Sequence, residues 1–336
     1  MVTMGNSIQS TKMGKKWNWG IIAPGKIAEK FASDLKLVDE VNLYAVASRS
    51  LEKAQAFANK FDAEIAYGSY EELAKDTNVD IVYIASPHTF HYEHSLLCLR
   101  NGKHVLCEKP MAISSSKIKK LMEVALEKKV FLMEALWTKF IPSFRKCYEL
   151  VQEGQIGEIK YIQSNFCFMA EYDTNKRLFN KELGGGSLLD IGIYPVFFAM
   201  ELAGKPDDIL ASAVIGKTGV DENCNVVFTY KKKGISASLS SSFLVNAPSE
   251  ALIAGTKGHI RMYSKWHEPT SLEAVIDGQI HHYAFDEPGF GYQYEIEEVI
   301  KCLNRGDLQS AEFPLFKSLR LHETLDYIRQ QIGLEY

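Results

Sequence analysis

The stretch WGIIAPGKIA, residues 19–28, runs from an apolar strand through a tight turn into the start of a helix. Many proteins that bind dinucleotides carry the pattern G-x-G-x-x-G at such a turn, and here it reads A-x-G-x-x-A. Gly25 allows the backbone to approach a pyrophosphate at the positive end of the helix, and the small Ala28 allows close helix–strand packing. Since Ala23 replaces the first glycine, the turn alone also fits an ordinary strand–turn–helix. The residues expected here to contact a dinucleotide are Ala23, Gly25, Lys26 and Ile27.

The end of the next strand supplies the residues that read the ribose 2′-position. Leu43–Ala47 leads into Ser48 and Arg49, with no acid at the strand end. An NAD enzyme usually places Asp or Glu there to bind the 2′-hydroxyl. Arg49 can instead pair with a 2′-phosphate and lie against the adenine ring. Taken alone, Arg49 also fits a solvated loop residue, but beside a phosphate turn it favours NADP over NAD.

The first part of the chain alternates short apolar runs with amphipathic helical stretches, which is typical of βαβ units and a parallel sheet. Apolar residues at 118, 121, 122, 125 and 126 form the clearest helical stripe. We therefore expect a flexible tail at 1–16 and a Rossmann-type dinucleotide-binding domain at 17–137. The predicted strands are Trp19–Ala23, Leu43–Ala47, Ile81–Ala85, His104–Cys107 and Val130–Met133.

The pattern changes after Pro142, where strand-like runs separated by turn signals dominate. This predicts an α+β domain at 138–336, built on an open, predominantly antiparallel sheet, for substrate binding and oligomerisation. Too few helices follow to cover both faces of that sheet, so we expect a homodimer or a larger homo-oligomer. The predicted strands are Ile159–Phe168, Ile209–Ile215, Asn225–Tyr230, Ile235–Ser241, Ala251–Ala254, Leu272–Ile276 and Ile280–Phe285, and the helices are Ser143–Glu153, Tyr292–Asn304 and Pro314–Gln331.

Composition narrows the class of partner. The 38 Lys+Arg against 42 Asp+Glu give a net charge of −4 without a basic block, so we expect no nucleic-acid partner. The six cysteines are scattered without a C-x-x-C pair, which favours reduced thiols in a cytoplasmic protein. We find no apolar run of about 18 residues, so we expect no membrane association.

Two loops at the carboxyl ends of parallel strands are expected to face a ligand. Ile81–Ala85 leads into Ser86, Pro87 and His88, and His104–Cys107 leads into Glu108 and Lys109. These five residues and His91 are predicted to line the cofactor site. Histidines at 88, 91 and 94 do not share one helix face, and no cysteine or carboxylate completes a set, so no metal is expected.

A glycine-rich run, GGGSLLDIGIYP at 184–195, carries the other candidate groups. Asp190 and Tyr194 stand at i and i+4, which places them on one face of a starting helix. Without further context, Asp190 also fits a helix N-terminal turn and Tyr194 a half-buried core residue. Candidates for flat faces under a sugar ring or an aromatic diol are Trp137, Phe166, Phe168 and Tyr172, although core packing is the other interpretation.

Taken together, these segments resemble the Gfo/Idh/MocA oxidoreductase family: the turn at 19–28, ASR at 47–49, GKHVLCEKP at 102–110 and the run at 184–195. FLMEALWT at 131–138 and Tyr194 are most similar to dimeric dihydrodiol dehydrogenases and NADP-dependent D-xylose dehydrogenases. The resemblance implies that Lys109, Asp190 and Tyr194 are catalytic, and that Trp137, Phe166 and Tyr194 bind substrate. The chain departs from the family pattern at Ala23, and at His88, where many members have Asn.

We therefore expect an NADP-dependent oxidoreductase that moves a hydride between nicotinamide and a secondary alcohol or hemiacetal carbon of a sugar or cyclic diol. Tyr194 is the first candidate for the proton carrier, with its tyrosinate favoured by the Lys109 cation; Lys109 itself is the alternative. One rival is a non-catalytic NADP-binding sensor. The other is an NAD-dependent inositol-type sugar dehydrogenase, for which the family pattern implies His at 194 and an acid near Ser48.

Overall fold

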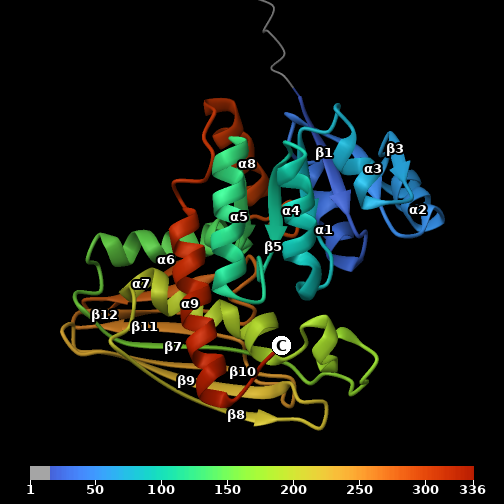
Figure 1. Ribbon diagram of the computed structural model, residues 1–336. Helices are drawn as coiled ribbons and strands as arrows, with labels where there is room; N and C mark the ends of the chain where they lie inside the picture. The colour runs from blue at the N-terminus through green and yellow to red at the C-terminus, as the bar shows by residue number, and fades with distance from the viewer. Residues whose placement is uncertain (1–15) are drawn as a thin grey trace, which may run out of the picture.

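The computed structural model describes residues 16–336, so the predicted tail lies almost entirely outside the described residues. Its first half is a six-stranded parallel sheet in the order β3-β2-β1-β4-β5-β6 (Figure 1). This order reverses direction beside β1, and such a switch point opens a crevice at the carboxyl ends of the strands. The strands are β1 (Trp17–Ile22), β2 (Val41–Ala47), β3 (Ile65–Tyr67), β4 (Ile81–Ile84), β5 (His104–Glu108) and β6 (Leu132–Ala135).

Helices cross over between these strands and begin where the sequence supplies caps. The hydroxyl oxygens of Ser50 and Ser69 accept from the backbone N–H groups of Lys53 and Glu72, which stabilises the starts of two helices. The predicted Rossmann-type sheet is confirmed. Strand β3 was not predicted because it has three residues and none of them is fully buried. The helices are α1 (Lys26–Leu35), α2 (Leu51–Phe61), α3 (Tyr70–Lys75), α4 (His91–Arg100) and α5 (Ser115–Lys128).

The second half is an eight-stranded sheet in the order β14-β13-β12-β11-β7-β10-β9-β8. Its pairings are antiparallel except for β10, which runs parallel to β7, so the predominantly antiparallel prediction is confirmed. Strand β12 was not predicted because its first residue, Gly258, reads as part of a turn. The strands are β7 (Ile159–Cys167), β8 (Asp208–Ile215), β9 (Asp221–Tyr230), β10 (Ile235–Ser242), β11 (Ala251–Gly255), β12 (Gly258–Met262), β13 (Leu272–Ile276) and β14 (Gln279–Tyr283).

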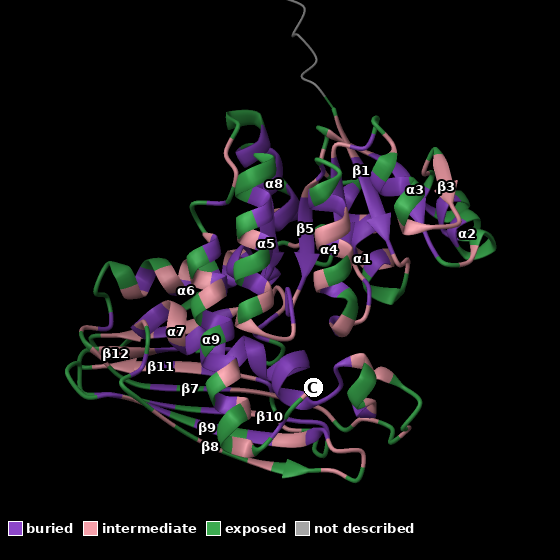
Figure 2. Ribbon diagram, in the orientation of Figure 1, coloured by how far each residue is buried: buried purple, intermediate pink, exposed green. Residues whose placement is uncertain are grey.

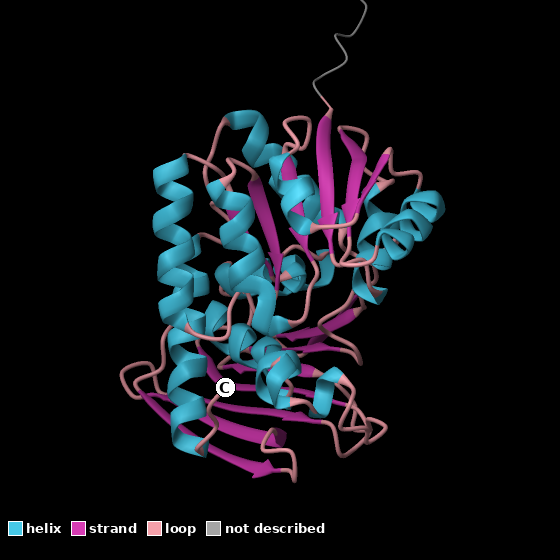
Figure 3. Cartoon of the chain, turned by 45° about the vertical axis from the view of Figure 1, so that its right-hand side comes forward, coloured by secondary structure: helices cyan, strands magenta, loops and turns pink. Residues whose placement is uncertain are grey.

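Four helices complete the chain: α6 (Pro142–Gln152), α7 (Ile193–Ala203), α8 (Gln293–Arg305) and α9 (Leu315–Ile332). Helix α9 contacts α5 and β6 of the first half and α7 and β8 of the second, so it ties the two halves together. Helices α6, α7 and α9 lie on one side of the large sheet, and the side away from them is bare of helices in both ribbon views (Figures 1 and 3). The division predicted at residues 137 and 138 stays a prediction.

Burial is concentrated in the parallel sheet and in the helix faces toward the two sheets, whereas β8 and β14 at the edges of the large sheet have no buried residue (Figure 2). All six cysteines are free and buried, as expected of small apolar core residues. The segment Lys181–Ala203 is long and apolar enough to cross a membrane by length and composition alone. This segment was not predicted from the sequence. Its most apolar window is 89% buried inside the structure, where α7 packs between the large sheet and α9.

Candidate active site

A cavity of about 670 Å³ opens at the carboxyl ends of β1, β4 and β5 and extends toward the large sheet. Most of the residues that the sequence singled out line it, although they come from both halves of the chain. The predicted residues on its wall are Ala23, Gly25, Ile27, Ser48, Arg49, Ser86, Pro87, His88, His91, Glu108, Lys109, Trp137, Phe166, Asp190 and Tyr194. Lys26 is the exception, because its side chain is exposed outside the lined surface.

The turn after β1 has the geometry of a phosphate cradle. Helix α1 begins directly after Gly25, and no side chain caps it, so its first N–H groups are free to meet an anion. A Cβ at Gly25 would come no closer than 4.0 Å to any atom outside its chain neighbours, which leaves open the space that a pyrophosphate would fill. Ala23 takes the place of the first glycine and has φ of 63°, in the left-handed region that favours glycine.

A polar cluster follows β2 at the other end of this crevice. Ser48, Arg49, Ser50 and Lys53 line the cavity together, and Arg49 is exposed beside the Tyr70 hydroxyl. The Ser48 hydroxyl accepts from the N–H of Ser50 at 3.3 Å, which fixes the loop. Two cations, Arg49 and Lys53, lie beside the start of α2 and make a site suited to a doubly charged phosphate. Lys53 was not predicted, since nothing in its own sequence environment marks it.

The two predicted histidines differ in role. The Nδ1 of His88 lies 3.1 Å from the carbonyl oxygen of Gly184, which makes it the donor, while Nε2 lies 3.3 Å from Arg177 Nη1 and can accept. Burial, followed by Arg177, lowers the pKa of His88, consistent with this neutral form. Both nitrogens of His91 lie within 2.7 Å of the carbonyl oxygens of Pro110 and Ser86, so it ties two loops together.

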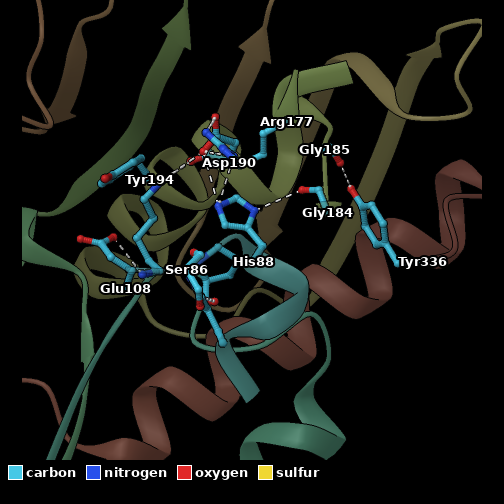
Figure 4. Close-up of polar contacts among 12 residues, drawn as sticks. Ser86, His88, Glu108, Arg177, Gly184, Gly185, Asp190, Tyr194 and Tyr336 are labelled. Carbon is cyan, nitrogen blue, oxygen red and sulfur yellow. Dashed lines mark hydrogen bonds and ion pairs between the residues drawn. The ribbon is translucent and has the colours of Figure 1, made fainter. Parts of the chain in front are cut away.

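The central charge of the site is Asp190, which Figure 4 shows between Arg177 and His88. Arg177 approaches its two carboxylate oxygens at 3.0 Å each, and Lys109 Nζ lies 3.5 Å from Oδ1. The ammonium of Lys109 also donates to the backbone carbonyl of Asp190 at 2.6 Å. Burial alone would raise the pKa of Asp190, but the positive charges of Arg177 and Lys109 outweigh it and hold that pKa well below its ordinary value.

Glu108 lies on the same wall with both carboxylate oxygens engaged. One accepts from the Tyr83 hydroxyl, and the other accepts from the backbone N–H of Lys109 at 3.2 Å. Burial raises the pKa of Glu108, against the lowering effect of the neighbouring Lys109 charge. Glu108 therefore fixes the turn that carries Lys109.

Tyr194 stands beside this network, with the Lys109 ammonium 4.9 Å from its ring centre. Its hydroxyl oxygen accepts from the indole N–H of Trp137 at 2.8 Å, which leaves the phenolic hydrogen free to point elsewhere. Burial and then the charge of Glu108 raise the pKa of Tyr194 well above its ordinary value. This differs from the expectation that Lys109 would favour the tyrosinate, because burial and the Glu108 charge favour the neutral phenol.

Trp137 lines the cavity, but one face of its ring is taken. It stacks on Tyr292 with ring centres 4.5 Å apart and planes 4° apart, and only 5% of the residue is exposed. Its clearest contact with the site is therefore the hydrogen bond to Tyr194. Phe166 stacks on His267 at 3.7 Å and lies 5.8 Å from the Tyr194 ring, so these rings form the wall around the phenol.

The backbone leading to Asp190 is held by buried polar groups. Asp221 Oδ2 accepts from the Ser187 hydroxyl at 2.8 Å and from the Leu188 N–H at 2.6 Å. The Tyr336 hydroxyl donates to the carbonyl oxygen of Gly185 (Figure 4). A π-helical segment, Leu188–Gly192, precedes α7, so Asp190 and Tyr194 do not lie in one regular α-helix. Both nevertheless lie on the same cavity wall.

Sequence reasoning missed several lining residues, which come from loops far apart in the chain. Arg177 precedes the glycine run without a motif of its own, and His267 and Glu268 follow a buried tryptophan in an irregular loop. Within residues 16–336, no group of three His, Cys, Asp or Glu side chains is arranged to hold a metal. Among the four predicted aromatic residues, Phe168 also lines the cavity, whereas Tyr172, like Lys26, is exposed outside the lined surface. The other lining residues that were not predicted are Pro24, Lys30, Ser50, Tyr70, Ala85, Ile191 and Tyr292.

Comparison with known proteins fits this geometry. Residues 17–136 match the model for the oxidoreductase family Gfo/Idh/MocA with an NAD-binding Rossmann fold, and 144–261 match the C-terminal domain of the same family. Trans-1,2-dihydrobenzene-1,2-diol dehydrogenases are similar along nearly their whole length: that of Xenopus tropicalis is 38% identical over 332 residues (95% of this chain, 98% of the relative). That of Homo sapiens is 34% identical over 336 residues (95% and 97%).

Solved structures share the fold. KijD10, a 3-ketoreductase from Actinomadura kijaniata in complex with NADP and TDP-benzene, matches with a TM-score of 0.85 at 24% identity, covering 95% of this chain and 98% of that one. The aldose-aldose oxidoreductase of Caulobacter crescentus matches with a TM-score of 0.87 at 21% identity, with the same coverage. The parallel sheet, the cavity at its switch point and the match over both halves show that this chain belongs to the Gfo/Idh/MocA family of NAD(P)-dependent oxidoreductases.

Proposed function

We propose that this chain is an NADP-dependent oxidoreductase that transfers a hydride between nicotinamide and a secondary alcohol or hemiacetal carbon of a sugar or cyclic diol. The observation that carries the proposal is the joining of Lys109, Asp190 and Tyr194 on the wall of one cavity that continues to Arg49. The relatives named as dihydrodiol dehydrogenases support a diol, and the structural neighbours named as a ketoreductase and an aldose oxidoreductase support a sugar.

The residues present fit the cofactor. The uncapped start of α1 at Gly25 would hold the pyrophosphate, and the pocket of Ser48, Arg49 and Lys53 would hold a 2′-phosphate. When bound, the nicotinamide supplies or accepts the hydride. Because no acid stands at the end of β2, no carboxylate there can accept from a free 2′-hydroxyl, which supports NADP over NAD.

The protein manages the proton at the substrate oxygen. Since the pKa of Tyr194 is raised and its oxygen already accepts from Trp137, the phenol is placed to donate a hydrogen bond to that oxygen. Lys109, held by the Asp190 carbonyl and carboxylate, is then the group that exchanges the proton. Arg177 keeps Asp190 ionised, and the ionised carboxylate keeps the ammonium in place.

A substrate panel tests the proposal directly. Aldoses, ketoses, inositols and trans-dihydrodiols are offered with NADP⁺ and with NAD⁺, and the absorbance of the reduced cofactor is followed. We expect turnover of at least one sugar or diol, with higher kcat/KM for NADP⁺. Tight NADPH binding without turnover of any member would support the rival function of a non-catalytic sensor. A preference for NAD⁺ with inositols would support the other rival.

We also propose that the bare face of the large sheet joins two copies of the chain. Strand β8 alternates exposed and half-buried residues, and Leu210, Val214 and Val227 on this sheet are 71%, 53% and 43% exposed. Large apolar side chains exposed on an uncovered sheet face favour contact between subunits. Sedimentation should give a dimer or larger at micromolar concentration, and a species of 37.9 kDa would contradict it.

A further inference from the structure

The turn that carries Lys109 is held at three points along its backbone. The N–H of Lys109 donates to Glu108 at 3.2 Å, and the carbonyl oxygen of the next residue lies 2.7 Å from Nδ1 of His91. The third point is the N–H of Met111, which donates to Oε1 of Glu134 at 2.8 Å. Glu108 and His91 line the cavity, whereas Glu134 is fully buried outside the lined surface.

A histidine from a distant part of the chain fixes the Glu134 carboxylate. His322 lies on α9 and is only 1% exposed, and its Nε2 is 2.7 Å from the same oxygen, Oε1. Burial alone would raise the pKa of Glu134, but His322 and the N–H of Met111 outweigh it and lower that pKa, so the carboxylate is ionised near neutral pH. An ionised carboxylate only accepts hydrogen bonds, so Nε2 of His322 is the donor. Glu134 therefore joins the Lys109 turn to α9.

Stability does not explain a carboxylate at this place. The neighbours of Glu134 in β6, Met133 and Ala135, are fully buried and apolar. Taking an ionised group out of water costs free energy that a packed apolar side chain avoids, so a buried ion pair is weak evidence for stability. What the carboxylate adds is a fixed geometry, because one oxygen receives a donor from the turn and a donor from α9.

Helix α9 also packs beside the segment that carries the partner of Lys109. It contacts α7, which directly follows the π-helical segment that contains Asp190. The Lys109 ammonium donates to the carbonyl oxygen of Asp190 at 2.6 Å. The contact between Glu134 and His322 therefore fixes the backbone of Lys109 to the same helix that packs beside the Asp190 segment.

We propose that Glu134 and His322 are positioning residues for Lys109: they hold the backbone of its turn so that the ammonium stays at the substrate oxygen, and they touch neither substrate nor cofactor. The inference rests on the proposed function, because it assigns how the same site keeps its proton carrier in place. A displacement of about 1 Å in a reacting group can cost about 10²-fold in rate. Loss of this anchor should therefore lower kcat rather than weaken binding.

The test compares two substitutions of Glu134. Glu134→Leu removes the anchor, and we expect kcat to fall about 10- to 100-fold, with KM and the dissociation constant for NADPH changed less than about threefold. Glu134→Gln keeps a carbonyl oxygen that can accept both hydrogen bonds, so it should retain kcat within about threefold of wild type. The matched control is Lys317→Met, which removes an ion pair between α9 and Glu201 of α7 and should leave kcat unchanged.

A double variant separates positioning from a general structural role. If Glu134 acts only through Lys109, adding Glu134→Leu to Lys109→Met should lower kcat by less than about threefold more. Multiplied losses, no rescue by Glu134→Gln, or an equal loss in Lys317→Met would overturn the proposal. His322→Leu provides the test if Glu134→Leu does not fold, because it leaves the carboxylate in place without its donor. Its kcat should fall about tenfold, and a wild-type kcat in this folded variant would overturn the proposal.

Hydrogen exchange of the Met111 N–H, followed by NMR, gives a measurement that needs no turnover. Exchange should be at least about tenfold faster in Glu134→Leu, because the acceptor is gone, and unchanged in Glu134→Gln and Lys317→Met. Equal exchange in wild type and Glu134→Leu would overturn the inference. If wild type turns over no sugar or diol, or if Lys109→Met keeps the kcat of wild type, the proposed function fails instead, and the exchange rates alone decide whether Glu134 anchors the turn.

Discussion

The two ends of the cavity are built in different ways. The proposed cofactor-binding end, which includes Gly25, Ser48 and Arg49, is formed by short loops that directly follow β1, β2 and β4. Its main feature is the start of α1 after Gly25, where no side chain caps the backbone N–H groups. The substrate end comes from loops far apart in the chain, and buried side-chain contacts such as Arg177–Asp190 and Trp266–Asn165 hold it together. The cofactor end therefore depends on local backbone geometry, whereas the substrate end depends on a coupled polar network.

The strongest test of this difference is to break the network of Lys109, Asp190 and Tyr194 that is proposed to act in catalysis. Lys109→Met and Tyr194→Phe should each lower kcat by two to three orders of magnitude, because a positioned proton carrier contributes about 10²–10⁴-fold and Tyr194 is proposed to act as a unit with Lys109 at the substrate oxygen. The dissociation constant for NADPH should change only a few-fold, since neither residue is part of the phosphate cradle. Steady-state kinetics with a turnover substrate and fluorescence titration of NADPH measure the two effects.

The double variant sharpens the assignment. Groups that act as a unit lose little more together than the worse of the two alone. Multiplication of the two losses in the double variant would show that Lys109 and Tyr194 act independently. A kcat near that of wild type in either folded single variant would remove that residue from the mechanism.

This difference also explains what the sequence could predict. The turn at 19–28 and the strand end at Ser48 and Arg49 are contiguous, so the fold and most of the cofactor end could be read directly. Arg177 and Glu268 could not, because their positions depend on contacts made across the fold, such as that between Trp266 and Asn165, which are 101 residues apart. The pKa of Tyr194 depends on burial, which the residue pattern does not specify.

Asp221 provides a test of the substrate end through stability. Burial raises its pKa from 3.8 to about 6, despite hydrogen bonds from Leu188 and Ser187. An acid with a raised pKa binds its proton more tightly in the folded chain, so its contribution to stability is complete below pH 3.8 and is lost as pH rises through about 6. Relative to Asp221→Asn, the free energy of unfolding of wild type should fall by about 2–3 kcal/mol between pH 4 and 7.

Urea unfolding of the two proteins at several pH values measures that difference. Asp207→Asn is the control, because Asp207 is exposed and outside the network. Parallel pH profiles for wild type and Asp221→Asn would show that folding does not change the pKa of Asp221. The buried Asp221 carboxyl would then contribute nothing to the pH dependence of the unfolding free energy.

Arg49→Ala breaks the cofactor end without touching the network. Loss of a charged contact to the 2′-phosphate costs about 1.5–3 kcal/mol, so NADPH should bind about 10- to 100-fold more weakly while NADH is nearly unaffected. Because Arg49 is exposed at a loop, the fold should be unchanged. Titration with both cofactors provides the measurement. Equal affinities of wild type for NADPH and NADH would contradict the assignment of this pocket to the 2′-phosphate.

The smallest effect is expected at Ala23, where the cofactor end carries local strain. Its φ of 63° costs an L-residue about 1–2 kcal/mol, and part of the gain from glycine is offset by the greater flexibility of the unfolded chain. Ala23→Gly should therefore raise stability by about 1 kcal/mol or less and leave kcat unchanged. The matched control is Ala28→Gly, five residues on in helix α1, which should lower stability by about 1 kcal/mol. Urea unfolding of the three proteins gives the sign of each change in unfolding free energy. If Ala23→Gly were as destabilising as Ala28→Gly, the turn would not be strained. Alanine would then suit this turn as well as the glycine of the family pattern.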